Sequence, residues 1–234
     1  MIDIHCHLLP FTDDGPKSWE ETYAMCEAAY ADGIRHIVPT PHCDRRYRFE
    51  RKSGEEKIQH LRERYPDLKF SLGCEFTLSY DNLDRAVQNP KGFTLGSTNY
   101  ILVEPSEILR PNQNEEGLHE LRGLGLIPVL AHPERNTFLR NQVELLEEWT
   151  EAGCLSAITG NSLTGFWGQE IRQRAEMMLK RGLVHCIVSD GHDPVRRPLV
   201  LSAGVAAAAK IVGEEAARAL AVDNPGRIVD GLPL

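Results

Sequence analysis

The amino-acid sequence predicts an α/β protein whose parallel strands form a (β/α) barrel, with seven rather than eight strands. Short runs rich in β-branched residues alternate with helical segments, which is typical of successive βα units. The chain of 234 residues has no linker-like change of composition, and one barrel commonly uses about 200 to 250 residues. We therefore expect a single domain over residues 1–234, with a doubly wound open sheet as the alternative.

Seven segments have the composition and length of strands, because β-branched and aromatic side chains suit a pleated sheet. The predicted strands cover residues 2–7, 34–39, 69–74, 100–104, 127–131, 155–159 and 184–189.

Helices are predicted between these strands. Ser18 is followed three residues later by Glu21, which is the pattern of a capping box, and this helix is expected to run to Asp32 and stop at Gly33. Ser53 and Glu56 repeat the pattern before a second helix that ends near residue 65. Further helices are expected over 115–123, 142–152, 166–180, 198–212 and 214–221.

Charge and hydropathy exclude two classes of partner. The 26 basic and 34 acidic side chains give a formal net charge of −8, which argues against a protein that binds nucleic acid by general attraction to phosphates. The sequence contains no apolar stretch long enough to span a bilayer and no signal-peptide pattern at its start. We therefore expect a cytoplasmic protein without membrane insertion.

Histidines and carboxylates stand at or just after the ends of six predicted strands. These side chains are His5, His7, His42, Glu75, Glu104, His132, Asp190 and His192. Because the carboxyl ends of barrel strands converge at one mouth, such groups would lie close together, and burying them is costly unless cations compensate their charge. Imidazole and carboxylate ligands without an obligatory thiolate suit zinc, manganese or iron, and two or three ions fit this number of ligands.

The order of these motifs carries a resemblance. His5-Cys-His7, Asp13-Asp14-Gly15, Thr40-Pro-His42, His132-Pro-Glu-Arg135 and Ser189-Asp-Gly-His192 resemble the polymerase and histidinol phosphatase (PHP) superfamily. The opening IDIHCHLLPFTDDGPKSWEE and the ending VDNPGRIVDGL are similar to the bacterial capsule-type PHP protein-tyrosine phosphatases. The resemblance implies a distorted (β/α)7 barrel with two or three divalent ions, commonly Mn²⁺. It also implies hydrolysis of phosphotyrosine on a bacterial tyrosine kinase, at its C-terminal tail, in control of exopolysaccharide and capsule synthesis.

The resemblance also implies a ligand set. The first ion takes His5, His7, Glu75 and Asp190, the second takes Glu75, Glu104 and His132, and the third takes His42, His192 and Asp14. Asp13 is the alternative to Asp14. Arg135 and Arg197 match positions that contact phosphate, and Arg196 is the alternative to Arg197. A bidentate guanidinium suits a phosphate group better than lysine does.

Two features leave alternatives open. The basic loop 44–52 either recruits an acidic or phosphorylated tail or is a solvated charge run, and a nucleic-acid role for Tyr47 and Phe49 is disfavoured by the acidic balance. The function itself has two alternatives, a small-molecule phosphatase such as histidinol-phosphatase and a non-catalytic metal-binding module.

Cysteine chemistry is disfavoured by the same sequence. The residue six positions after each cysteine is never arginine, as a phosphocysteine mechanism requires, and no CxxC pair suggests a structural zinc. Reduced cysteines that fill the core are expected, and metal-activated water is the predicted nucleophile.

Overall fold

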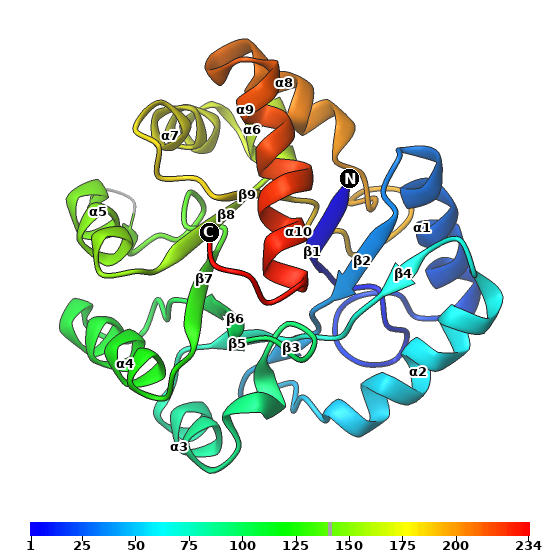
Figure 1. Cartoon of the computed structure of the whole chain (residues 1–234), viewed down its shortest axis with the longest axis horizontal. Helices are drawn as coiled ribbons and strands as arrows, with labels where there is room; N and C mark the ends of the chain where they lie inside the picture. Colours follow the sequence, from blue (N-terminus) through cyan, green and yellow to red (C-terminus); the bar gives the residue numbers. More distant parts are fainter. Residues whose placement is uncertain (140–141) are drawn as a thin grey trace.

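A computed structural model describes residues 1–139 and 142–234 of the chain as parallel strands surrounded by helices (Figure 1). One sheet has the order β1-β2-β4, and the other has the order β3-β5-β6-β7-β8-β9. The strands are β1 (Ile2–Cys6), β2 (His36–Pro39), β3 (His42–Cys43), β4 (Lys69–Phe70), β5 (Glu75–Thr77), β6 (Tyr100–Glu104), β7 (Ile127–Ala131), β8 (Leu155–Thr159) and β9 (Cys186–Val188). The predicted α/β class with parallel pairing is confirmed.

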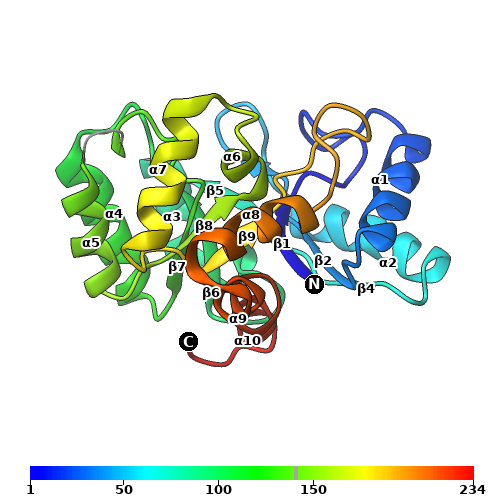
Figure 2. The ribbon, with the colours of Figure 1, turned by 90° about the horizontal axis from the view of Figure 1, so that it is seen from above.

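The helices lie outside the strands and, at one end, across them. They are α1 (Trp19–Ala31), α2 (Arg51–Arg64), α3 (Tyr80–Gln88), η1 (Pro90–Phe93), α4 (Pro111–Gly123), α5 (Val143–Glu151), α6 (Gly160–Thr164), α7 (Gln169–Lys180), α8 (Ser202–Val212), α9 (Glu214–Arg218), η3 (Ala219–Asp223) and α10 (Asn224–Val229). Figure 2 shows the loops that follow β1 and β9 on one side of the strands, and α10 with the C-terminus on the other. The carboxyl ends of the strands are therefore left to the loops.

Two predicted strands are interrupted. The segments 34–39 and 69–74 contribute β2 and β4 to the smaller sheet, after which the chain enters the larger sheet as β3 and β5. Pro39 and Pro41 have no N–H to donate, so the ladder of β2 cannot continue unbroken into β3. This change of sheet matters for the site, because it places His42 opposite Glu75 where β3 pairs with β5.

Several helix boundaries differ from the sequence-based expectations. The cap at Ser18 is confirmed, since its side chain accepts a hydrogen bond from the Glu21 N–H. The capping box at Ser53 is wrong: α2 begins at Arg51, whose guanidinium donates to the carbonyls of Gly92 and Leu72. These tertiary contacts outweigh a local signal worth about 1 kcal/mol.

Three helical segments were absent from the prediction or merged in it. Helix α3 follows a Ser79 cap and contains Asp81, Asn82 and Asp84, which have low intrinsic helix propensity and hid it. The helix expected over 166–180 begins only at Gln169, as α7, and the short helix α6, which was not predicted, precedes it, with Gly165 and Gly168 at positive φ between the two. The terminal helix continues beyond residue 221 through η3 and α10. The helix expected over 142–152 is confirmed as α5.

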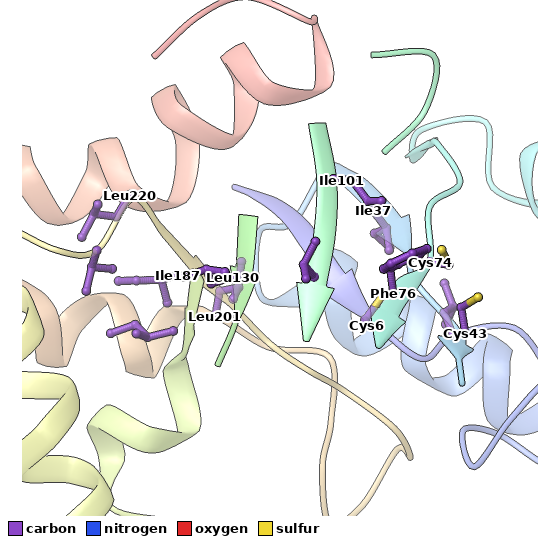
Figure 3. Packing of buried hydrophobic residues seen from close by; sticks show 14 of the residues in the cluster. Cys6, Ile37, Cys43, Cys74, Phe76, Ile101, Leu130, Ile187, Leu201 and Leu220 are labelled. Carbon is purple, nitrogen blue, oxygen red and sulfur yellow. The ribbon is translucent and has the colours of Figure 1, made fainter. Parts of the chain in front are cut away.

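The buried apolar residues form two clusters, one on the inner side of the two sheets and one between strands and helices. The inner cluster contains Ile4, Val38, Leu102, Val129 and Val188. Ile228 of α10 joins this cluster from the side of the amino-terminal ends of the strands. The outer cluster is shown in Figure 3, where Cys6, Cys43 and Cys74 lie among Ile37, Phe76 and Ile101. All six cysteines are free and buried, as expected of core filling. None of the helices described is long and apolar enough to cross a membrane.

Hydrogen bonds join the two sheets where the site lies. The Asp190 N–H donates to the His5 carbonyl at 2.9 Å, and the His7 N–H donates to the Gly191 carbonyl at 2.8 Å. Buried Asp3 accepts from the Ser189 N–H at 3.1 Å. These bonds place the end of β1 beside the segment after β9, although the two are more than 180 residues apart in the sequence.

Candidate metal centre

Strand periodicity directs Glu104 into the mouth formed by the strand ends. Along β6, Tyr100 and Leu102 belong to the inner cluster, whereas Ile101 and Val103 belong to the outer one. Side chains two residues apart share a face of a strand, so Glu104 faces inward directly beyond Leu102.

A β-bulge directs the histidines of β1 to the same place. Asp3 pairs with Ile37 and Cys6 pairs with Pro39, so three steps along β1 match two along β2. Without this shift Ile4 and Cys6 would share a face, but Ile4 lies in the inner cluster and Cys6 in the outer one. The bulge therefore moves His5 and His7 to the inner side, which is a recurrent use of bulges at functional sites.

The structure brings all nine side chains of the predicted ligand set together. Four groups of ligand atoms, each within 4.8 Å of one another, are His7, Asp14, His42 and His192; His5, His7 and Glu75; His5, His132 and Asp190; and His42, Glu75 and Glu104. His7 and His192 are in ring contact, with centroids 3.8 Å apart. The cluster joins residues from seven different strand ends or loops.

Buried polar atoms without hydrogen bonds indicate that the cluster suits cations. His5 Nε2, His7 Nε2, His42 Nδ1 and Glu75 Oε2 are buried, and none makes a hydrogen bond of good geometry among the described residues. The three imidazole nitrogens instead lie 2.9 to 3.4 Å from oxygens of the Glu75 carboxylate. A buried polar atom without a partner costs about 1 to 3 kcal/mol, so such atoms are rare unless they serve a ligand. Each of the four belongs to a residue of the ligand groups above.

The pKa shifts of the carboxyl groups in the cluster also indicate a cation site. Burial raises the pKa of the Glu104 carboxyl, and the nearby charge of Glu75 raises it further. For Asp190, burial also raises the pKa, but His5, His132 and the two arginines outweigh it and hold the carboxyl ionised. Carboxylates crowded in this way, beside imidazoles with free ring nitrogens, are suited to divalent cations.

Asp13 and Asp14 have different surroundings. Asp13 is buried, and its Oδ2 accepts hydrogen bonds from His7 Nδ1 at 2.7 Å and from the His42 N–H at 2.9 Å. Asp14 is about half exposed, with Oδ1 3.5 Å from both His42 Nε2 and His192 Nε2. Asp13 thus orients two ligand candidates from behind, and Asp14 faces the open side of the cluster.

Gly15 completes this loop. Its N–H donates to Asp13 Oδ1 at 3.0 Å, and a Cβ atom at Gly15 would lie 2.6 Å from the His7 carbonyl oxygen. Only glycine therefore lets the loop pack against the histidine strand.

Asp13→Asn is expected to lower metal affinity about 10- to 100-fold, because the amide removes the negative charge that orients His7, and loss of such an outer partner has this scale. Titration of the metal-free protein with Mn²⁺ measures the change. Asp44→Asn is a control, since that carboxylate bonds only backbone N–H groups of its own loop among the contacts described. Unchanged affinity in Asp13→Asn would contradict the role of Asp13.

Two ligand candidates have strained backbones. His132 and Asp190 have φ angles of +33° and +51°, a region that residues other than glycine seldom occupy. Each follows a strand end, β7 or β9, and turns its side chain toward the cluster. Strain of this kind is typically retained where function requires the geometry.

Arg135 and Arg197 converge on Asp190. Both guanidinium groups donate to Asp190 Oδ2, Arg197 at 2.6 Å, while Asp190 Oδ1 lies 3.4 Å from His5 Nε2. Arg196, the alternative to Arg197, is exposed, and its backbone N–H bonds Asp193. The two arginines therefore stand at the edge of the histidine and carboxylate cluster.

Sequence reasoning missed three residues that support the cluster. Thr40 Oγ1 is 2.7 Å from His5 Nδ1 and so orients the imidazole. Glu134 is buried and accepts hydrogen bonds from Thr159 and Ser162, which ties the loop after β7 to α6.

The third residue, Trp167, lies under both arginines, with its ring centroid 4.4 Å from the Arg135 guanidinium and 5.3 Å from that of Arg197. A threonine two residues before His42 was a usable signal, but nothing local indicated Trp167.

A parallel α/β fold that gathers imidazoles and carboxylates at its strand ends is typical of metal-dependent enzymes. Residues 1–230 match the family described as capsular polysaccharide synthesis, CpsB/CapC. The chain belongs to this family. The tyrosine-protein phosphatase CpsB of Streptococcus pneumoniae is 34% identical over 242 aligned residues, which cover 98% of each chain.

Solved structures agree with this assignment. A crystal structure from a study of YwqE from Bacillus subtilis and CpsB from Streptococcus pneumoniae, described as unique metal-dependent tyrosine phosphatases, superposes with a TM-score of 0.89. The sequence of that structure is 29% identical to this one, and the match covers 100% of this chain and 96% of the solved chain. Histidinol phosphate phosphatase from Lactococcus lactis has a TM-score of 0.60 at 13% identity, covering 92% of each chain, which shows a shared fold alone.

Proposed function

We propose that this protein is a metal-dependent protein-tyrosine phosphatase that hydrolyses phosphotyrosine with an activated water. The observation that carries the proposal is the set of buried imidazole and carboxylate atoms that make no hydrogen bond, beside two arginines. Divalent ions held there would supply Lewis acidity and the activated water. Membership of the CpsB/CapC family, whose relatives are named tyrosine-protein phosphatases, supports the choice of phosphotyrosine.

The family resemblance guides the assignment of residue roles. We assign the first ion to His5, His7, Glu75 and Asp190, the second to Glu75, Glu104 and His132, and the third to His42, His192 and Asp14. The ligand groups in the structure contain the same nine residues but combine His132 with His5 and Asp190, and His42 with Glu75 and Glu104. Two or three ions fit this set, with Mn²⁺ as the expected metal and iron or zinc as alternatives. Thr40 and Asp13 hold the rings of His5 and His7 in orientation.

Arg135 and Arg197 are the proposed phosphate-binding residues. Their guanidinium groups meet at one carboxylate oxygen of Asp190 and lie over Trp167, so both can turn toward a phosphate without leaving the cluster. Fixed cations at this place stabilise the charge that develops on the equatorial oxygens in phosphoryl transfer.

The remaining parts of the proposal concern architecture and partner. The proposed architecture is a distorted (β/α)7 barrel of the PHP type in one domain over residues 1–234, and it is supported by the seven strands obtained when β2 is counted with β3 and β4 with β5. The proposed substrate is the phosphorylated C-terminal tail of a bacterial tyrosine kinase in capsule or exopolysaccharide synthesis, and a cytoplasmic location stays a prediction.

Removal of metal is the direct test. Chelation is expected to reduce turnover of a phosphotyrosine peptide to background, and Mn²⁺ should restore it, because the activated water depends on the ions. Histidinol phosphate and a nucleotide monophosphate serve as competing substrates in the same assay. Full activity in a preparation shown to be metal-free would refute the mechanism, and preferred turnover of histidinol phosphate would refute the substrate.

A further inference from the structure

A cavity of about 410 Å³ opens beside the metal centre. It is lined by the loops that follow β3, β5 and β6, which lie at the same mouth as the ligand cluster. Glu104 belongs both to its wall and to the ligand group with His42 and Glu75. Whatever occupies the cavity is therefore next to the phosphate site, and the volume lies within the range of small-molecule pockets.

The walls of this cavity expose large apolar side chains. Ile108 is 91% exposed and Tyr80 is 61% exposed, and both face the cavity together with Leu78 and Leu109. Apolar side chains that gather at one place on a surface commonly mark an interaction site. Their position beside the metal centre suits a part of the substrate that is itself apolar.

The rim of the cavity is basic on one side. Arg45 and Arg46 line it, both are exposed, and neither forms an ion pair with any residue that the structure describes. Two of the lining carboxylates are engaged elsewhere, since Asp44 accepts the Arg46 and Tyr47 N–H groups and Glu104 faces the ligand cluster. Asp81, in the first turn of α3, is the remaining carboxylate of the lining.

We propose that this cavity binds the polypeptide segment beside the phosphotyrosine, with an apolar or aromatic side chain against Ile108 and Tyr80 and an acidic residue at Arg45 and Arg46. The inference rests on the proposed function. An extended chain advances about 3.3 to 3.6 Å per residue, so residues close to a phosphotyrosine held at the ions reach a cavity that shares Glu104 with the centre. The basic loop thus selects acidic protein substrates.

Two variants test the proposal. Ile108→Asp and the double variant Arg45→Glu with Arg46→Glu are assayed on free phosphotyrosine and on a phosphotyrosine peptide with aromatic and acidic neighbours. We expect kcat/KM for the peptide to fall about tenfold or more through KM, the scale of losing an interface anchor, while free phosphotyrosine stays within about twofold. A peptide with lysine in place of its acidic residues should regain turnover with the double variant.

Arg48→Glu is the matched control, because Arg48 lies on the same loop but pairs with Glu50 at 2.9 Å and does not line the cavity. It should behave like the wild type with both substrates. Unchanged peptide kinetics in the test variants would overturn the proposal, and so would an equal loss with free phosphotyrosine. If the wild type hydrolyses neither substrate, the proposed function fails separately, and calorimetry of peptide binding then decides the cavity: equal affinity for wild type and variants would overturn it.

Discussion

His132→Ala is expected to lose bound metal and phosphatase activity together. His132 is buried at the end of β7, with Nε2 2.7 Å from Glu75 Oε1, and its left-handed backbone holds the ring at the proposed second ion. Removing the imidazole deletes a proposed ligand and leaves Glu75 without this partner. We expect kcat/KM to fall by more than about 100-fold, the loss that even an outer partner of a metal ligand can produce.

Elemental analysis of the purified variant, alongside kinetics on a phosphotyrosine peptide, measures both effects. His119→Ala is the control, since His119 is exposed on α4 and belongs to none of the described ligand groups. Circular dichroism establishes that each variant is folded. Wild-type metal content and activity in folded His132→Ala would show that this histidine is not a ligand.

Arg135→Ala is expected to keep its metals and lose about 100-fold or more in kcat/KM, the scale of deleting one charge-stabilising group from a preorganised site. Metal retention follows from the geometry, because Arg197 also donates to Asp190 Oδ2 and keeps that carboxylate in place. Arg197→Ala should have the same kind of effect, because its guanidinium donates to the same Asp190 oxygen and lies over the same Trp167 ring.

Arg196→Ala provides the matched control on an exposed neighbouring arginine. Kinetics and metal analysis are measured in parallel for all three variants. Wild-type kinetics in Arg135→Ala would make the guanidinium a structural ion-pair partner of Asp190 only. Loss of metal in Arg135→Ala would instead show that the arginine acts by positioning Asp190.

Most of the parallel α/β fold could be read from the sequence, because buried strands and amphipathic helices leave periodic apolar patterns. The strands expected over 100–104, 127–131 and 155–159 coincide with β6, β7 and β8. The two segments that change sheets were wrong in extent, since a register change between sheets depends on neighbouring strands. Helix α3 was missed because tertiary burial of Leu83 and Ala86, rather than local propensity, stabilises it.

The sequence by itself determined which chemical groups meet, because a polar side chain placed just after a parallel strand has one mouth into which to project. Position at the strand ends identified eight of the nine histidine and carboxylate side chains that the structure gathers, and the ninth, Asp14, was implied by the family resemblance, with Asp13 as its alternative. Only the tertiary structure decided how they face one another. The bulge in β1 turned His5 and His7 inward, the burial of Asp13 separated its role from that of Asp14, and Trp167 reached the arginines from a distant loop. These outcomes depend on contacts between segments far apart in the chain, and local sequence patterns carry no record of such contacts.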